Sequence, residues 1–185
     1  MARNNALLET YTDITLLHHP CGDTIARYIE LQEAMAAGHT KAIGVSNFNA
    51  DLLAQMAADP RVKIVPAVNQ CNHAIGNHNE SHSPKTGGDD KTVAYCKAHN
   101  ISYSVGASTT PTLEGLSGKD VFDLPQVIAI AKVHNVSGAQ VALRWLVQQS
   151  ITVVTAAHNP EYIAEDLDVF SFQLTTAEMD TLAAI

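Results

Sequence analysis

The stretch GHTKAIGVSNF, from Gly38 to Phe48, decides the fold of this chain. Gly38 can end a preceding helix in the left-handed conformation, and Lys41–Val45 is short, apolar and β-branched enough for a buried strand. Ser46 and Asn47 follow at once as paired side-chain donors and acceptors. Ser and Asn are also common helix N-caps, so the local pattern leaves two interpretations open: a helix cap, or a polar site at a strand end.

Strand and helix patterns alternate on both sides of this stretch. Asp13–Leu17 is a compact apolar run, and Thr24–Ala37 has apolar residues at helical spacing. Strand, helix, strand is the pattern of a parallel sheet. The rest of the chain continues it, with strands predicted at 63–68, 101–105 and 151–154, helices at 50–58, 93–99, 124–134 and 139–149, and helix starts near Asn159 and Thr175 or Thr176.

Five strands with polar residues at their C-terminal ends predict an α/β fold. Part of a TIM-type (β/α) barrel and a doubly wound sheet both fit this pattern. A complete barrel needs eight strands and typically ~250 residues, whereas this chain has 185. We expect residues 1–185 to form one domain, with an inserted loop at 74–90 that is rich in Asn, His, Ser and Gly.

Composition limits the classes of function. The formal charge is −8, from 19 acidic and 11 basic residues, and no Lys/Arg stripe occurs, which argues against nucleic acid. No apolar run is long enough for a membrane span or resembles a signal peptide. The cysteines fit no CxxC spacing and predict free thiols in a reducing compartment, cytoplasm or an organelle lumen or stroma; they are Cys21, Cys71 and Cys96.

Several motifs together resemble one family. Gly38–Phe48 is similar to the GKIRAIGVSNF signature of the aldo-keto reductases, and Asp13–Pro20 to their D-L-Y-L-I-H-W-P. Further matches are Ala67–Gln70 to P-x-V-N-Q, Ala139–Trp145 to A-Q-V-A-L-R-W, and Pro160–Phe170 to P-E-x-I-x-E-N-x-x-V-F. The matches follow family order and spacing over nearly the whole chain. The resemblance implies a partial barrel of about five parallel strands that correspond to strands four to eight.

The resemblance also implies an activity that this chain carries only in part. In the family a hydride passes from NADPH to a carbonyl while a Tyr, tuned by a Lys, an Asp and a His, gives the proton. His18 matches that His, whereas the Asp, Tyr and Lys belong to strands that this sequence does not include. None of the five tyrosines matches the catalytic position.

One end of the implied cofactor site is retained. The Ser-Asn pair and the Gln that hold the nicotinamide carboxamide in the family are matched by Ser46, Asn47 and Gln70. Such side chains offer an amide its acceptor and donors without adding charge.

The other end of that implied site is altered. The Tyr that stacks on the nicotinamide falls at or near Gly106, and I-P-K-S lines up with Val154–Ala157, without the Lys and Ser that contact phosphate. Tyr162 stands at the following Arg position, Glu165 matches the Glu near the adenine, and Asp166 replaces the usual Asn. We therefore expect binding of NADP(H) to be weakened or lost.

Two functions are compatible with a site of which one end is retained and the other is altered. The first is a non-catalytic accessory or structural subunit, a pseudoenzyme whose open barrel edges are covered by another protein chain. The alternative is an NADP(H)-dependent carbonyl reductase whose N-terminal catalytic strands are missing from this chain or supplied by another.

The inserted loop raises the question of a metal site. His73, His78 and His82 with Glu80 are residue types that bind zinc. We expect a flexible loop in which no ligand is rigidly placed, and therefore no metal. Arg144 and Trp145 lie in a predicted amphipathic helix and are interpreted as structural residues.

Overall fold

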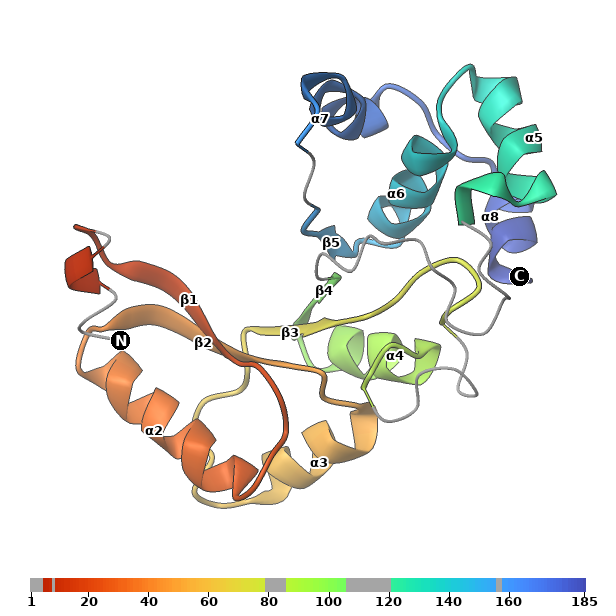
Figure 1. The fold of residues 1–185 in the computed structure, drawn as a ribbon. Coiled ribbons are helices and arrows are strands. Elements are labelled where there is room, and N and C mark those ends of the chain that lie inside the picture. Colours follow the sequence, from red (N-terminus) through yellow and green to blue (C-terminus); the bar gives the residue numbers. More distant parts are fainter. Residues whose placement is uncertain (1–4, 8, 79–85, 106–120, 156–157) are drawn as a thin grey trace.

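A single parallel sheet organises the residues that the computed structural model describes, which are 5–7, 9–78, 86–105, 121–155 and 158–185. Five strands pair in chain order and every pairing is parallel, as the sequence predicts (Figure 1). The strands are β1 Thr12–Leu17, β2 Thr40–Ser46, β3 Val68–Cys71, β4 Ser102–Val105 and β5 Thr152–Val153.

Helices follow the strands in the predicted order. Their bounds are α2 Thr24–Ala36, α3 Ala50–Ala58, α4 Asp90–Ala98, α5 Pro125–His134, α6 Gly138–Gln148, α7 Pro160–Leu167 and α8 Thr176–Ala183, with short 3₁₀ turns η1 Val121–Asp123 and η2 Asp168–Phe170. Asn159 and Thr175 cap α7 and α8 with their side chains. None of the helices in these described ranges is long and apolar enough to cross a membrane.

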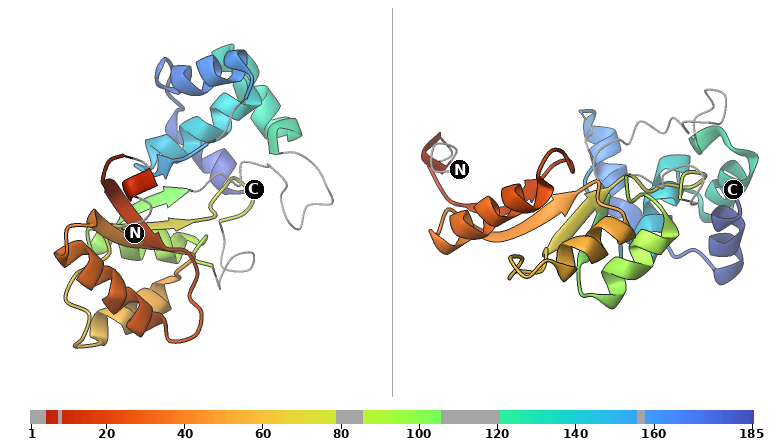
Figure 2. Two further views of the ribbon diagram at one scale, coloured as in Figure 1. Left: turned by 60° about the vertical axis from the view of Figure 1, so that its left-hand side comes forward. Right: turned by 90° about the horizontal axis from the view of Figure 1, so that it is seen from below.

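The two faces of the sheet are buried to different extents. Ile43 and Val45 of β2 are at most 1% exposed and lie on the same face of the strand. Ile14 of β1 pairs with Ala42 on the opposite face, and 50% of Ile14 is exposed. In the right-hand view of Figure 2, β1 and the C-terminal helix α8 lie at opposite ends of the molecule. Among the described residues β1 and β5 do not pair with each other, so the sheet is open and these two strands are its edges.

The third strand begins later than the sequence predicts. The predicted strand at 63–68 was placed too early, since β3 starts at Val68. At the predicted start, the backbone is bonded to α2 instead of to a strand, because Gln32 Oε1 accepts from the amides of Lys63 at 2.7 Å and Ile64 at 2.9 Å. The Tyr28 hydroxyl also donates to the Ile64 carbonyl oxygen at 3.1 Å. These side-chain bonds satisfy groups that would otherwise pair in the sheet.

Helix α6 fixes the C-terminal half of the core. Trp145 is 2% exposed, as expected of a structural residue. Arg144 donates to the Gln148 side chain at 2.9 Å and to the Val169 carbonyl oxygen at 3.3 Å. Both residues thus tie α6 to its surroundings, in agreement with their structural interpretation.

Candidate functional site

The polar loop after β2 lies at a strand end and does not cap helix α3. Helix α3 is capped by Asn49, whose side chain accepts from the Leu52 amide at 2.9 Å. Ser46 and Asn47 therefore do not cap this helix, and the cap interpretation is wrong. A polar site at the strand end stays a prediction. Asn47 takes a left-handed backbone with φ of +63°, which Asn tolerates better than most residues.

Backbone and side-chain bonds join this loop to the end of β3. Ser46 Oγ donates to the Gln70 carbonyl oxygen at 2.7 Å, and the Asn47 amide donates to the same oxygen at 2.9 Å. These two bonds fix the loop after β2 to the end of β3. Three predicted site residues, Ser46, Asn47 and Gln70, are brought together at the C-terminal edge of neighbouring strands.

His18 joins the same group from the end of β1. Asn47 Nδ2 lies 2.9 Å from the His18 carbonyl oxygen, 3.1 Å from His19 Nδ1 and 3.1 Å from Ser46 Oγ. The exposed imidazoles of His18 and His19 lie with their centroids 4.0 Å apart. The structure therefore places the predicted histidine beside the amide cluster, with its ring on the surface.

The cluster retains hydrogen-bonding capacity that fits a carboxamide. Ser46 and Asn47 use the backbone oxygen of Gln70, and within the described residues the side-chain amide of Gln70 has no hydrogen-bond partner. Asn47 Nδ2 is fully used, whereas its Oδ1 remains an acceptor. The Gln70 amide offers donors and an acceptor, and Asn47 Oδ1 offers a second acceptor nearby. Together they can bind a neutral amide group of a ligand.

A buried network beneath the cluster was not predicted from the sequence. Asn69 is fully buried, and its Nδ2 donates to the Phe48 carbonyl oxygen at 2.7 Å. Gly87, with φ of +71°, lies so close that a Cβ there would collide with that same oxygen. The Tyr103 hydroxyl donates to the Gly87 carbonyl oxygen at 2.7 Å. These contacts support the loop after β2. In the sequence, only a glycine in the inserted loop and the polar residue next to Gln70 could have pointed to them.

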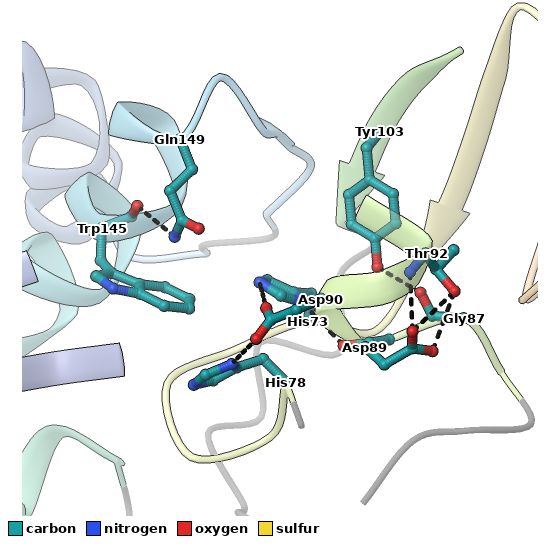
Figure 3. Close-up of polar contacts among 10 residues, drawn as sticks. His73, His78, Gly87, Asp89, Asp90, Thr92, Tyr103, Trp145 and Gln149 are labelled. Carbon is teal, nitrogen blue, oxygen red and sulfur yellow. Dashed lines mark hydrogen bonds and ion pairs between the residues drawn. The ribbon is translucent and has the colours of Figure 1, made fainter. Parts of the chain in front are cut away.

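His73 and the described part of the 74–90 loop that follows it are anchored in the core. The ring of His73 stacks on Trp145, with centroids 5.5 Å apart and planes 10° apart, and His73 Nδ1 lies 2.9 Å from the Gly88 oxygen (Figure 3). Asp90 lies between the imidazoles of His73 and His78, 3.9 Å from Nε2 of the first and 3.0 Å from Nδ1 of the second. The expectation of a flexible loop is wrong for His73 and His78, because both pack against Trp145.

Only part of the predicted zinc-binding cluster lies within the described residues. Burial lowers the pKa of His73, and its Nε2 is buried without a hydrogen-bond partner. Among the described residues, no group of three or more potential ligands is placed to hold a metal ion. His82 and Glu80, the other predicted ligands, lie outside the described residues.

Burial lowers the reactivity of two of the three cysteines. The three cysteines are free, and Cys71 and Cys96 are buried. Burial raises the pKa of the Cys71 thiol to about 12 and that of the Cys96 thiol to about 11. Both thiols therefore stay protonated and unreactive near neutral pH.

The second predicted part of the site lies on α7, after β5. Glu165 and Asp166 are half-buried, and Glu165 accepts from Gln140 Nε2 through its backbone oxygen at 3.2 Å. Burial, aided by the neighbouring Glu165, raises the pKa of Asp166. None of the contacts described here joins these residues to the Ser46 cluster. Gly106, Ala156 and Ala157 lie outside the described residues.

A parallel sheet of alternating strands and helices, with polar side chains gathered at the C-terminal strand ends, defines the class of α/β proteins that bind ligands at this edge. The aldo/keto reductase family model matches residues 3–185. This chain belongs to the aldo/keto reductase family.

Individual relatives agree with that assignment. An aldo-keto reductase of Mycolicibacterium smegmatis is 34% identical over 177 residues, which are 93% of this chain and 55% of the relative. Prostaglandin F synthase 1 of Bos taurus is 33% identical over 158 residues, covering 82% of this chain and 45% of the relative. The chain thus spans about half the length of the curated relatives it matches.

A solved structure supports the fold. An aldo-keto reductase enzyme from a Medee basin deep-sea metagenome library superposes with a TM-score of 0.81 at 29% identity. The match covers 99% of this chain and 62% of that one. The five parallel strands thus match part of a TIM-barrel-like fold, as the resemblance implied.

Proposed function

We propose that this chain is the nicotinamide-binding part of an NAD(P)H-dependent oxidoreductase that reduces carbonyl compounds. The observation that carries the proposal is the cluster at the ends of β1, β2 and β3. There, within the part of the chain that the structure describes, the side-chain amide of Gln70 and Oδ1 of Asn47 have no hydrogen-bond partner, and both lie beside the exposed ring of His18.

Each residue of the cluster has a separate task in this proposal. Gln70 and Asn47 hydrogen-bond a ligand carboxamide, and Ser46 fixes the distance between the strand ends by donating to the Gln70 backbone. The nicotinamide supplies the hydride chemistry when bound. His18 offers a polar ring at the same edge, where it can hydrogen-bond a substrate carbonyl oxygen.

The proton donor must come from residues outside this stretch of 185. The resemblance assigns it to a Tyr, with its Lys and Asp, on strands that this sequence does not contain. The open edges of the sheet and the exposed side of β1 are the surfaces against which such strands would pack. We propose that the rest of a longer chain, or a partner subunit, supplies them.

An accessory, non-catalytic role is the second candidate. It is favoured by the loss of Lys, Ser and Arg from the family's phosphate-binding positions, which the length of the chain does not explain. The relatives named above are described as a reductase, a synthase and a reductase enzyme, and these descriptions favour the catalytic proposal.

The test is an assay of the native protein, with every segment or subunit that accompanies this sequence. Aldehyde and ketone panels are mixed with NADH or NADPH, and loss of nicotinamide absorbance is followed. Turnover that falls in a Gln70→Met variant supports the proposal. A fully assembled protein that oxidises neither nucleotide contradicts it, and favours the accessory role.

A further inference from the structure

A hollow of about 340 Å³ lies at the end of the sheet opposite to the Ser46 cluster. It is lined by Ala67, Ile101 and Ile151, which directly precede β3, β4 and β5. Because these neighbouring strands are parallel, they all begin at the same edge, and the hollow lies there. In (β/α) barrels this edge serves stability and not catalysis, so the proposed function does not account for a hollow of ligand size.

One wall of the hollow is apolar and fixed. Val93 of α4 contributes to it, together with Ile101, Tyr103 and Ile151. The last three residues are at most 6% exposed. The Tyr103 hydroxyl donates to the Gly87 carbonyl oxygen at 2.7 Å, which holds this residue in place. Such a wall suits the hydrocarbon part of a small ligand.

Two left-handed turns form a polar rim on the hollow. Asn100 lies between α4 and β4 with φ of +55°, and Ser150 lies between α6 and β5 with φ of +63°. Within the part of the chain that the structure describes, neither the Asn100 amide nor the Ser150 hydroxyl has a hydrogen-bond partner. Both side chains can therefore donate to a ligand.

Lys97 supplies the charge of this rim. It lies in the last turn of α4, four positions after Val93, so both side chains are on one face of the helix. Among the described residues that line the hollow, Lys97 is the one charged group. None of the ion pairs between described residues includes it. An ammonium without a carboxylate partner, beside an apolar wall, favours an anionic ligand.

The two helices that end at the hollow do not exclude an anion. Free carbonyl groups at a helix C-terminus carry partial negative charge. In α6, however, the Trp145 oxygen accepts from Gln149 Nε2 at 3.0 Å (Figure 3), and the Leu146 oxygen accepts from the Gln149 amide at 3.0 Å. In α4 the Cys96 oxygen accepts from the Ile101 amide at 2.9 Å. These bonds reduce the repulsion that a carboxylate would meet.

We propose that this hollow binds small organic monocarboxylates. Lys97 and Asn100 contact the carboxylate, and the hydrocarbon part of the ligand packs against Val93, Ile101 and Ile151. The site is separate from the proposed dinucleotide site, because the two lie at opposite ends of the strands. Its existence therefore does not depend on the proposed function.

Calorimetric titration of the native protein with phenylacetate and with neutral phenylacetamide tests the proposal. The two compounds share their hydrocarbon part and differ in charge. We expect phenylacetate to bind with a Kd of about 1 mM and phenylacetamide about tenfold more weakly, the ratio that one charge-assisted hydrogen bond can produce. Equal affinities would overturn the role of charge, and binding of neither compound would overturn the site.

A matched pair of variants on α4 localises the binding. Lys97 is exposed, so Lys97→Gln leaves the core intact. It should weaken phenylacetate binding by about tenfold and leave phenylacetamide binding unchanged. Lys91→Gln is the control, because Lys91 is bonded to Asp51 at 2.9 Å and does not line the hollow. It should change neither affinity.

Gln70→Met distinguishes the two ends of the sheet. Phenylacetate binding that weakens in Gln70→Met and stays unchanged in Lys97→Gln would place the ligand at the Ser46 cluster and overturn the proposal. The account predicts the reverse pattern, with phenylacetate affinity preserved in Gln70→Met.

Discussion

The two ends of the proposed cofactor site differ in how they are built. At the ends of β1 to β3, Asn47 and Ser46 rest on a buried network in which Asn69 and Gly87 meet the backbone of Phe48. After β5, helix α7 has no buried residue. Changes at the first end should therefore alter both stability and binding, whereas changes at the second end should alter binding alone. The following predictions are ordered by the expected size of their effect.

The largest loss of stability is expected for Gly87→Ala. A Cβ at this left-handed position would collide with the Phe48 carbonyl oxygen. The cost should be about 2–5 kcal/mol, from the backbone conformation and from overpacking together. Gly38→Ala is the matched control, because φ is +75° there and nothing lies within 4 Å of the added Cβ. Its cost should be about 1–2 kcal/mol, and equal losses in urea unfolding would exclude a role for the Phe48 contact.

A smaller loss is expected for Asn69→Leu. The substitution removes the donor to the Phe48 oxygen at 2.7 Å and leaves that acceptor with only the weak Cys71 thiol contact at 3.8 Å. Such a loss costs about 1–3 kcal/mol and should also weaken NADH binding, since Phe48 follows Ser46 and Asn47 directly. Chemical denaturation and calorimetry measure the two effects. Lower stability with unchanged NADH affinity would separate the network from the site.

The His73 cluster should make stability depend on pH. Burial lowers the pKa of His73 in the folded state, so unfolding takes up a proton when the pH falls below the ordinary histidine value of about 6.5. This contribution to the free energy of unfolding is complete above that pH and declines below it. The groups facing the ring are Gly88, His78, Asp89, Asp90, Tyr103 and Trp145.

His73→Gln tests this dependence, because an amide can replace the bond to Gly88 and does not titrate. The variant should lose less stability than the wild-type protein between about pH 7 and about pH 5. Thermal unfolding at several pH values measures the difference. Parallel curves for the two proteins would assign the acid sensitivity to other groups.

The smallest effect is expected at the α7 end. Leu167 and Phe170 are 74% and 70% exposed, so Leu167→Ser and Phe170→Ser should each change the free energy of unfolding by no more than about 0.5 kcal/mol. A much larger loss in the native assembly would mean that another segment or subunit covers these side chains. Comparison of the two serine variants in the assembled and dissociated protein distinguishes these cases.

The sequence predicts the parts of the fold that depend on local pattern. Ala50–Ala58 was predicted with its observed bounds, and the cap at Asn159 is confirmed. The predicted start of β3 was wrong, because the amides of Lys63 and Ile64 bond to a side chain from α2, some 30 positions away in the sequence.

The candidate site was predicted unevenly for the same reason. Family resemblance identified His18, Ser46, Asn47 and Gln70, and the structure brings them to one edge. The support by Gly87 depends on contacts between distant segments, which no local pattern encodes. The burial of His73 under Trp145 was hidden by the polar composition of its loop.

The central claim is that the Gln70 side chain is free to bind the nicotinamide end of a dinucleotide. Gln70→Met tests it most directly, because Ser46 and Asn47 bond to the Gln70 backbone oxygen and keep their positions in the variant. Calorimetry on the native protein should show NADH affinity reduced by about tenfold, with an unchanged unfolding midpoint. Unchanged NADH affinity in a folded Gln70→Met protein would contradict the account.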